Sequence, residues 1–119
     1  MIEMADPEFA AFLYNQKKKN QILQEDNNIQ LAGLEHEERN WRLVERWHNQ
    51  HGTPAEVKIV QNQIGLIQQE KEHFIQEREQ MSQLYGMLDK LISLPDVQPH
   101  YKRIADTQQR IDDEWRLLK

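Results

Sequence analysis

The sequence contains no cysteine among its 119 residues and has only four glycines and four prolines. Without cysteine it can form no disulfide framework and offers no thiolate for catalysis or metal binding. No apolar run approaches the ~18 residues of a membrane-spanning helix, and the N-terminus lacks the apolar segment of a signal peptide. We therefore expect a cytoplasmic protein that does not insert into a membrane.

Positive charge is also scarce. Lysine and arginine number 15 against 20 acidic residues, which gives a net charge of -5. Phosphate backbones bind to basic faces, so no nucleic-acid partner is expected. The mean hydropathy of -0.92 and the apolar share of 38% are typical of thin helical bundles. They do not suit a thick globular core.

The most regular feature of the chain is a 3-4 repeat of apolar residues between Val57 and Ile92. Such spacing is typical of a helix packed against other helices. Further apolar residues widen this stripe, which favours a middle helix with two neighbours over a simple two-stranded coiled coil. The repeat comprises Val57, Val60, Ile64, Ile67, Lys71, Phe74, Arg78, Met81, Tyr85, Leu88 and Ile92.

Two breaks divide the pattern into three helices. At the first, Gly52 suits the left-handed position after a helix, and Thr53-Pro54-Ala55-Glu56 matches a capping box with proline in the first turn. At the second, Pro95 and Pro99 end one helix and begin the next, with Asp96 or a residue near Gln98 as the cap. We therefore predict one helix ending at residue 50, a second over 54–93 and a third over 99–119.

The N-terminal region has a different character. Asp6-Pro7-Glu8-Phe9 is what adjoining BamHI and EcoRI cloning sites encode, so residues 1–9 are interpreted as vector-derived. Residues 10–28 are polar, and Asp26-Asn27-Asn28 are poor helix formers, so this stretch is interpreted as a polar helical lead-in or linker helix. The folded unit is then expected to cover residues 29–119.

The motifs in this region resemble those of a spectrin repeat, the three-helix unit of spectrins, α-actinins, plakins and nesprins. Trp41 lies centrally in the first helix, the long second helix follows, and Trp115-Arg116-Leu117-Leu118 is similar to the family's W-x-x-L. The resemblance implies an all-α fold, an elongated left-handed antiparallel three-helix bundle. In the family the third helix continues for several more turns, so the bundle is expected to be truncated at its C-terminus.

Most of the apolar residues singled out are assigned to the core of that bundle. A smaller set, near the end left without a third partner, is assigned to a partner surface through which two copies could form a homodimer; it comprises Trp47, Val57, Ile59 and Ile64. The core set comprises Trp41, Val44, Val57, Val60, Ile64, Ile67, Phe74, Met81, Leu88, Ile92, Ile104, Ile111, Trp115 and Leu118.

Polar residues offer no catalytic arrangement. Lys71 and Arg78 interrupt the repeat and are expected to fix its register or to extend toward solvent, with Glu37, Glu38 and Gln108 as candidate partners. His48 and His51 are three residues apart, but the second lies in the break and no carboxylate stands at ligand spacing. We expect no enzyme, no metal and no cofactor.

The leading hypothesis is a structural and interaction module. The resemblance implies a rod repeat of a cytoskeletal or scaffold protein that acts as a spacer and docks protein partners. The first alternative is a coiled-coil dimerisation or adaptor domain that assembles through the long second helix. The second is a bacterial or viral helical-bundle scaffold or effector.

Overall fold

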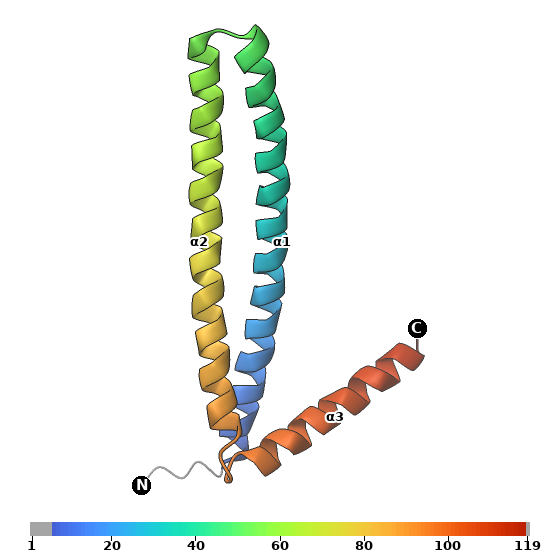
Figure 1. Ribbon diagram of the computed structural model, residues 1–119. Coiled ribbons are helices and arrows are strands. Elements are labelled where there is room, and N and C mark those ends of the chain that lie inside the picture. The colour runs from blue at the N-terminus through green and yellow to red at the C-terminus, as the bar shows by residue number, and fades with distance from the viewer. Residues whose placement is uncertain (1–5, 119) are drawn as a thin grey trace. The chain divides into compact units, whose positions relative to one another are not determined.

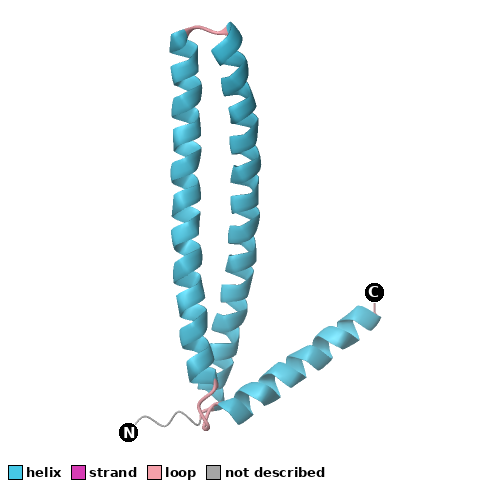
Figure 2. Ribbon diagram, in the orientation of Figure 1, coloured by secondary structure: helices cyan, strands magenta, loops and turns pink. Residues whose placement is uncertain are grey.

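A computed structural model describes residues 6–118. They form α1 (Pro7–His51), α2 (Pro54–Ile92) and α3 (Gln98–Leu117). Within residues 6–118 there is no strand, and only short turns separate the helices (Figure 2). The predicted all-α fold with three helices is confirmed. Residues 1–5 of the segment interpreted as vector-derived, and Lys119 of the predicted third helix, lie outside the described residues.

The chain divides into two compact units, each of which contains part of α1 and part of α2. Unit 2 comprises Leu23–Met81, and unit 1 comprises the residues before it, up to Ile22, together with Ser82–Lys119. In unit 2 the second half of α1 and the first part of α2 run antiparallel, side by side, and a short turn joins them (Figure 1).

The inner side of the unit 2 pair is apolar in its middle section. Leu31 and Leu34 of α1 and Val60, Ile64 and Ile67 of α2 are all buried. Each such side chain contributes about 1.5–3 kcal/mol when it leaves water. Packing of these side chains therefore stabilises the two helices more than their intrinsic helix propensity does.

The inner positions of α1 keep a strict 3-4 spacing that includes many polar residues. Apolar side chains alone do not reveal this repeat, so the sequence predicts a polar lead-in or linker helix over residues 10–28; instead, Leu13, Asn20 and Asn27 are buried. The buried or half-buried inner residues are Ala10, Leu13, Lys17 and Asn20 in unit 1, and Gln24, Asn27, Leu31, Leu34, Glu38, Trp41, Glu45 and His48 in unit 2.

Polar inner residues of unit 2 form a hydrogen bond and an ion pair between α1 and α2. The Asn27 side-chain amide donates to the Phe74 carbonyl oxygen at 2.9 Å. Lys71 Nζ lies 3.8 Å from Glu38 Oε1, so Glu38 is the partner of Lys71 among the candidates named from sequence. Arg78, the other polar residue of the α2 repeat, is exposed rather than held in the seam.

The turn between α1 and α2 is closed by a capping box. Thr53 N–H donates to Glu56 Oε1 at 3.0 Å, and Glu56 N–H donates to Thr53 Oγ1 at 3.2 Å. Two free amide donors at the start of α2 are thereby satisfied by side chains. These hydrogen bonds confirm the capping box read from the sequence.

Gly52 has a different role from the one expected. No glycine among the described residues has a positive φ, so the left-handed conformation predicted for Gly52 is wrong. Its N–H donates to the His48 carbonyl oxygen at 2.8 Å, which continues the helical hydrogen-bond pattern. Space is the requirement here, because a Cβ atom on Gly52 would lie 2.8 Å from His48 Cδ2 and 3.0 Å from the His48 carbonyl oxygen.

We therefore expect Gly52→Ala to lower the melting temperature. The matched control is Gly65→Ala within α2, where an added Cβ meets nothing within 4 Å. That substitution is expected to raise the free energy of unfolding by about 0.5–1 kcal/mol, because alanine loses less backbone entropy in a helix than glycine. Thermal unfolding followed by circular dichroism measures both. Equal shifts of the same sign would contradict the close contact at Gly52.

The capping box also predicts an acid-sensitive contribution to stability. The hydrogen bonds from the Thr53 backbone and side chain, with a smaller effect of His48, lower the pKa of Glu56 below its ordinary 4.5. A carboxylate with a lowered pKa stabilises the fold above its unfolded pKa, and this is lost as the pH falls through the folded value. The melting temperatures of wild type and Glu56→Ala should therefore converge as the pH falls from neutrality to well below 4.5. Glu72→Ala, at an exposed position of the same helix, is the control that should not show this convergence.

Unit 1 has its own core, to which all three helices contribute. Leu13 of α1, Leu88 and Ile92 of α2 and Val97 of the second turn are buried together, and Tyr101 of α3 packs against them. Of the two caps predicted for α3, the structure has the residue near Gln98: the cap is Val97, not Asp96, and it makes no side-chain hydrogen bond to the helix. Since Val97 is fully buried, packing fixes the start of α3. Ala10 completes the buried set, and Phe9, Leu91, Leu94 and Ile104 pack against it.

Candidate functional site: an acidic groove on the helix pair

Concave surfaces that carry polar groups include one in each unit. The smaller is a hollow of about 160 Å³ in unit 1, lined by Tyr14, Lys17, Lys18, Gln21 and Tyr101. The larger is an open groove of about 540 Å³ in unit 2. Their chemistry differs.

The unit 1 hollow contains Lys17, whose ammonium group is bonded to a carboxylate of α2. Lys17 Nζ donates to Asp89 Oδ1 at 2.8 Å and lies 4.9 Å from the centre of the Tyr85 ring. Partial burial opposes the charged form, but the bonds with Asp89 and Tyr85 outweigh it and raise the pKa of Lys17. Burial likewise raises the pKa of Tyr101. The ion pair between Lys17 and Asp89 joins α1 to α2 within unit 1.

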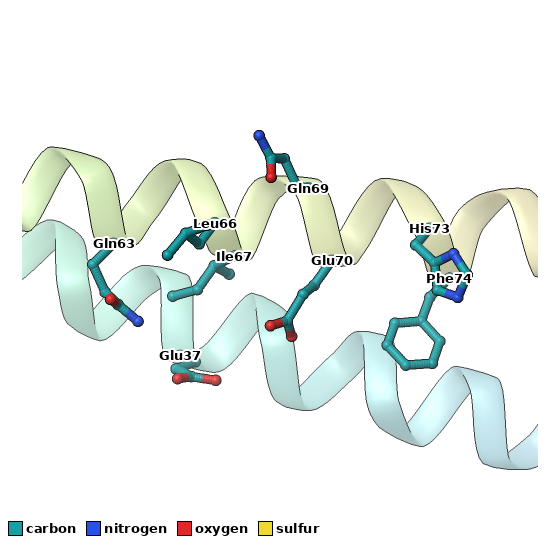
Figure 3. A pocket seen from close by; sticks show the side chains of 8 residues that line it. All are labelled: Glu37, Gln63, Leu66, Ile67, Gln69, Glu70, His73 and Phe74. Atoms are coloured by element: carbon teal, nitrogen blue, oxygen red, sulfur yellow. The ribbon is translucent and has the colours of Figure 1, made fainter.

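The unit 2 groove lies between α1 and α2 (Figure 3). Gln63, Glu70 and Phe74 point from α2 toward α1, and Glu37 comes from α1 on the same side of the pair. Ile67 is buried and Phe74 half-buried, so they form an apolar floor between carboxylates at the rim. The residues that line this groove, called the acidic groove below, are Glu37, Gln63, Leu66, Ile67, Gln69, Glu70, His73 and Phe74.

The surface around the acidic groove carries further apolar side chains. Leu23 lies two heptads from Glu37 and Ile59 lies one heptad from Leu66, so both are on this same side, because seven residues span two turns. Trp47 lies one heptad and a further i, i+3 step from Glu37, which also places it on this side. Leu23 is 46% exposed, Trp47 56%, Ile59 66% and Leu66 54%. Unit 2 therefore exposes four large apolar side chains along one flank. We call this flank of unit 2, with the acidic groove at its centre, the groove face.

Charge on the groove face has one sign. Unit 2 contains eleven acidic and six basic residues. Five acidic residues occupy groove-face positions of the heptad, namely Asp26, Glu37, Glu56, Glu70 and Glu77, whereas all six basic residues occupy other positions, namely Arg39, Arg42, Arg46, Lys58, Lys71 and Arg78. The histidines at groove-face positions are His51 and His73, and His73 Nε2 lies 3.2 Å from Glu77 Oε1.

The residues predicted from sequence to form a partner surface differ in their exposure. Trp47 and Ile59 are exposed on the groove face, while Val57 is half-buried. The assignment of Ile64 to a partner surface is wrong, because its side chain is 3% exposed on the inner side of the pair. Sequence reasoning missed Glu37, Glu70 and Leu66 as parts of one site. The signal for them is the absence of lysine and arginine from one heptad flank.

The residues assigned to the core have three outcomes. Val60, Ile64, Ile67, Leu88 and Ile92 are buried. The half-buried ones are Trp41, Val44, Val57, Phe74, Met81 and Ile104.

Ile111, Trp115 and Leu118 do not belong to the core, contrary to the sequence-based assignment. They are 39%, 62% and 79% exposed. The physical reason is that only the start of α3 packs against the unit 1 core, through Tyr101 and Ile104. Beyond Ile104 the apolar stripe of α3 is therefore open.

The histidines near the first turn make local contacts. His48 Nδ1 lies 2.9 Å from the Val44 carbonyl oxygen, and its Nε2 lies 3.7 Å from Glu56 Oε2. Over residues 6–118 no three histidines, aspartates or glutamates are grouped so that they could hold a metal ion. In the same range no helix combines the length and the apolarity needed to cross a membrane.

In comparisons with known proteins, no family model, curated protein or solved structure matches this chain.

Proposed function

We propose that this chain is a non-enzymatic protein-interaction module whose unit 2 helix pair binds a helix of another protein. The observation that carries the proposal is the groove face, on which Leu23, Trp47, Ile59 and Leu66 are all about half-exposed or more along one flank. A pair of helices with a wide apolar flank has the surface that a third helix covers in a bundle.

The more specific form of the proposal is a spectrin-like rod repeat, in which the helices act as a spacer within a larger cytoskeletal or scaffold protein. The three-helix, all-α architecture and the strict 3-4 repeats support it. In that role the length of α1 and α2 sets a separation between neighbouring modules, and the groove face recruits the partner.

Site-directed photo-cross-linking tests the interaction function. A benzophenone amino acid at position 66 lies on the groove face, and one at position 68 lies on the opposite flank of α2. We expect cross-links to another polypeptide from position 66 and few from position 68. Absence of cross-links from both positions, in extracts of the cells that make the protein, would contradict the proposal.

A second candidate function is self-association. The open stripe of α3 (Ile111, Trp115 and Leu118) favours it, because an amphipathic helix exposing these side chains gains by pairing. Sedimentation equilibrium over a wide concentration range distinguishes the two functions. A monomer favours docking of other proteins, and a tight dimer favours assembly of the chain with itself.

A further inference from the structure

The groove face has a chemical preference as well as a shape. Its floor is apolar at Ile67 and Phe74, and its rim carries Glu37 and Glu70 on opposite helices. A helix laid along it would place apolar residues on the floor and would bring its two flanking rows close to these carboxylates.

Those flanking rows need positive charge. The exposed carboxylates Glu37 and Glu70 are joined by Asp26 on the same flank, and no lysine or arginine of unit 2 occupies that flank to neutralise them. Like charges brought together at an interface cost several kcal/mol, whereas opposite charges steer the encounter and fix the register.

The protein's own α3 fits this requirement poorly. The heptad positions that directly flank its apolar stripe near Trp115 hold Asp112 and Glu114, and Arg110 and Arg116 lie one position further from the stripe. A second copy that docks α3 on the groove face would bring these carboxylates toward Glu37 and Glu70. The charge pattern therefore favours a foreign helix over a copy of this chain.

We propose that the groove face binds a basic amphipathic helix of a partner protein, with apolar residues in a 3-4 repeat and lysine or arginine on both flanks. This inference rests on the proposed interaction function and names its partner class. About three heptads of such a helix, roughly 30 Å long, lie along one face of a helix pair.

The test uses a synthetic probe and the full chain. The probe is a fluorescent peptide of about three heptads with leucine at the two seam positions and lysine on both flanks, and its counterpart carries glutamate on the flanks. Binding is measured by fluorescence anisotropy at low and high salt. We expect saturable binding of the lysine peptide that weakens with salt, and no binding of the glutamate peptide.

Charge reversal locates the site. Glu37→Lys with Glu70→Lys should weaken binding of the lysine peptide by about tenfold or more. The control is Glu35→Lys with Glu72→Lys, which makes the same change in net charge at exposed positions on the opposite flank. It should change the affinity by less than about threefold, since a distant exposed charge is largely screened.

Each other outcome overturns the inference. Equal weakening by both double variants would show attraction to net charge without a site. Binding of the glutamate peptide would show an apolar surface without charge preference. No binding to wild type would exclude this partner class, and binding that appears only with Trp115→Glu would assign the groove face to α3. If cross-links from position 66 persist while the peptide fails, the interaction function stands and only the basic partner is wrong.

Discussion

Replacing Leu13 by alanine is expected to lower the free energy of unfolding by about 2–5 kcal/mol. Leu13 is 1% exposed and lies in the unit 1 core with Leu88, Ile92 and Val97. Truncating it removes buried apolar area and leaves a cavity between three elements that all meet there. Such a loss is a large fraction of the 5–15 kcal/mol that stabilises a typical domain. Urea unfolding followed by far-UV circular dichroism measures the change.

Phe12→Ala is the matched control for this substitution. Phe12 is the neighbouring residue and a larger apolar side chain, but it is 54% exposed. Its replacement should cost far less than that of Leu13, although it removes more atoms. Similar losses of stability in both variants would contradict the burial of Leu13 and the exposure of Phe12.

Replacing Asn27 by leucine is expected to raise the free energy of unfolding by about 1–3 kcal/mol. Asn27 is 3% exposed, and its side-chain oxygen has no hydrogen-bond partner among residues 6–118. An unsatisfied buried polar atom costs about that amount. The Phe74 carbonyl that now accepts from the Asn27 amide also lies within α2, where the N–H four residues later can satisfy it. Thermal and urea unfolding both report the gain.

The same variant should lose some of its specificity. A buried asparagine in a helix seam fixes register and the number of helices at a cost in stability. We therefore expect Asn27→Leu to form larger assemblies in sedimentation equilibrium than wild type does. Asn28→Leu changes the exposed neighbour and should alter neither stability nor assembly as strongly. A destabilised, monomeric Asn27→Leu would show that the amide is better satisfied than its contacts indicate.

Much of α2 could be predicted from its sequence, because its inner side is apolar. Val60, Ile64 and Ile67 repeat at 3-4 spacing and are buried as that spacing implies. The turn before α2 could be predicted equally well, because the threonine and glutamate of a capping box contact each other within one turn of the chain. Where a residue's neighbours lie within one turn of the chain, the sequence predicts its contacts.

The first half of α1 could not be recognised in this way. Its inner positions carry Lys17, Asn20, Gln24 and Asn27, so no apolar stripe distinguishes them. Their burial is decided by α2, which supplies the Asp89 carboxylate and the Phe74 carbonyl as partners. A polar residue in a seam is recognisable only once its partner is known.

The acidic groove is a site of the same kind. Glu37 and Glu70 are separated by 33 positions in the sequence, and nothing near either residue singles it out. They become one site because α1 and α2 run antiparallel in unit 2 and present the same flank. By contrast, the regular helical spacing of Trp115 predicts a core position. Spacing alone does not determine whether another element packs against the apolar stripe of α3.

The polar inner side of α1 also bears on the order in which the protein is made. The 45 residues of α1 leave the ribosome before any of α2 does. By itself this helix gains little from burying its inner side, because several of the side chains there are polar and would lose their bonds to water. Its lysine, asparagine and glutamate side chains find their bonding partners only when α2 emerges. The polar inner side of α1 in the nascent chain thus remains in contact with water until α2 emerges.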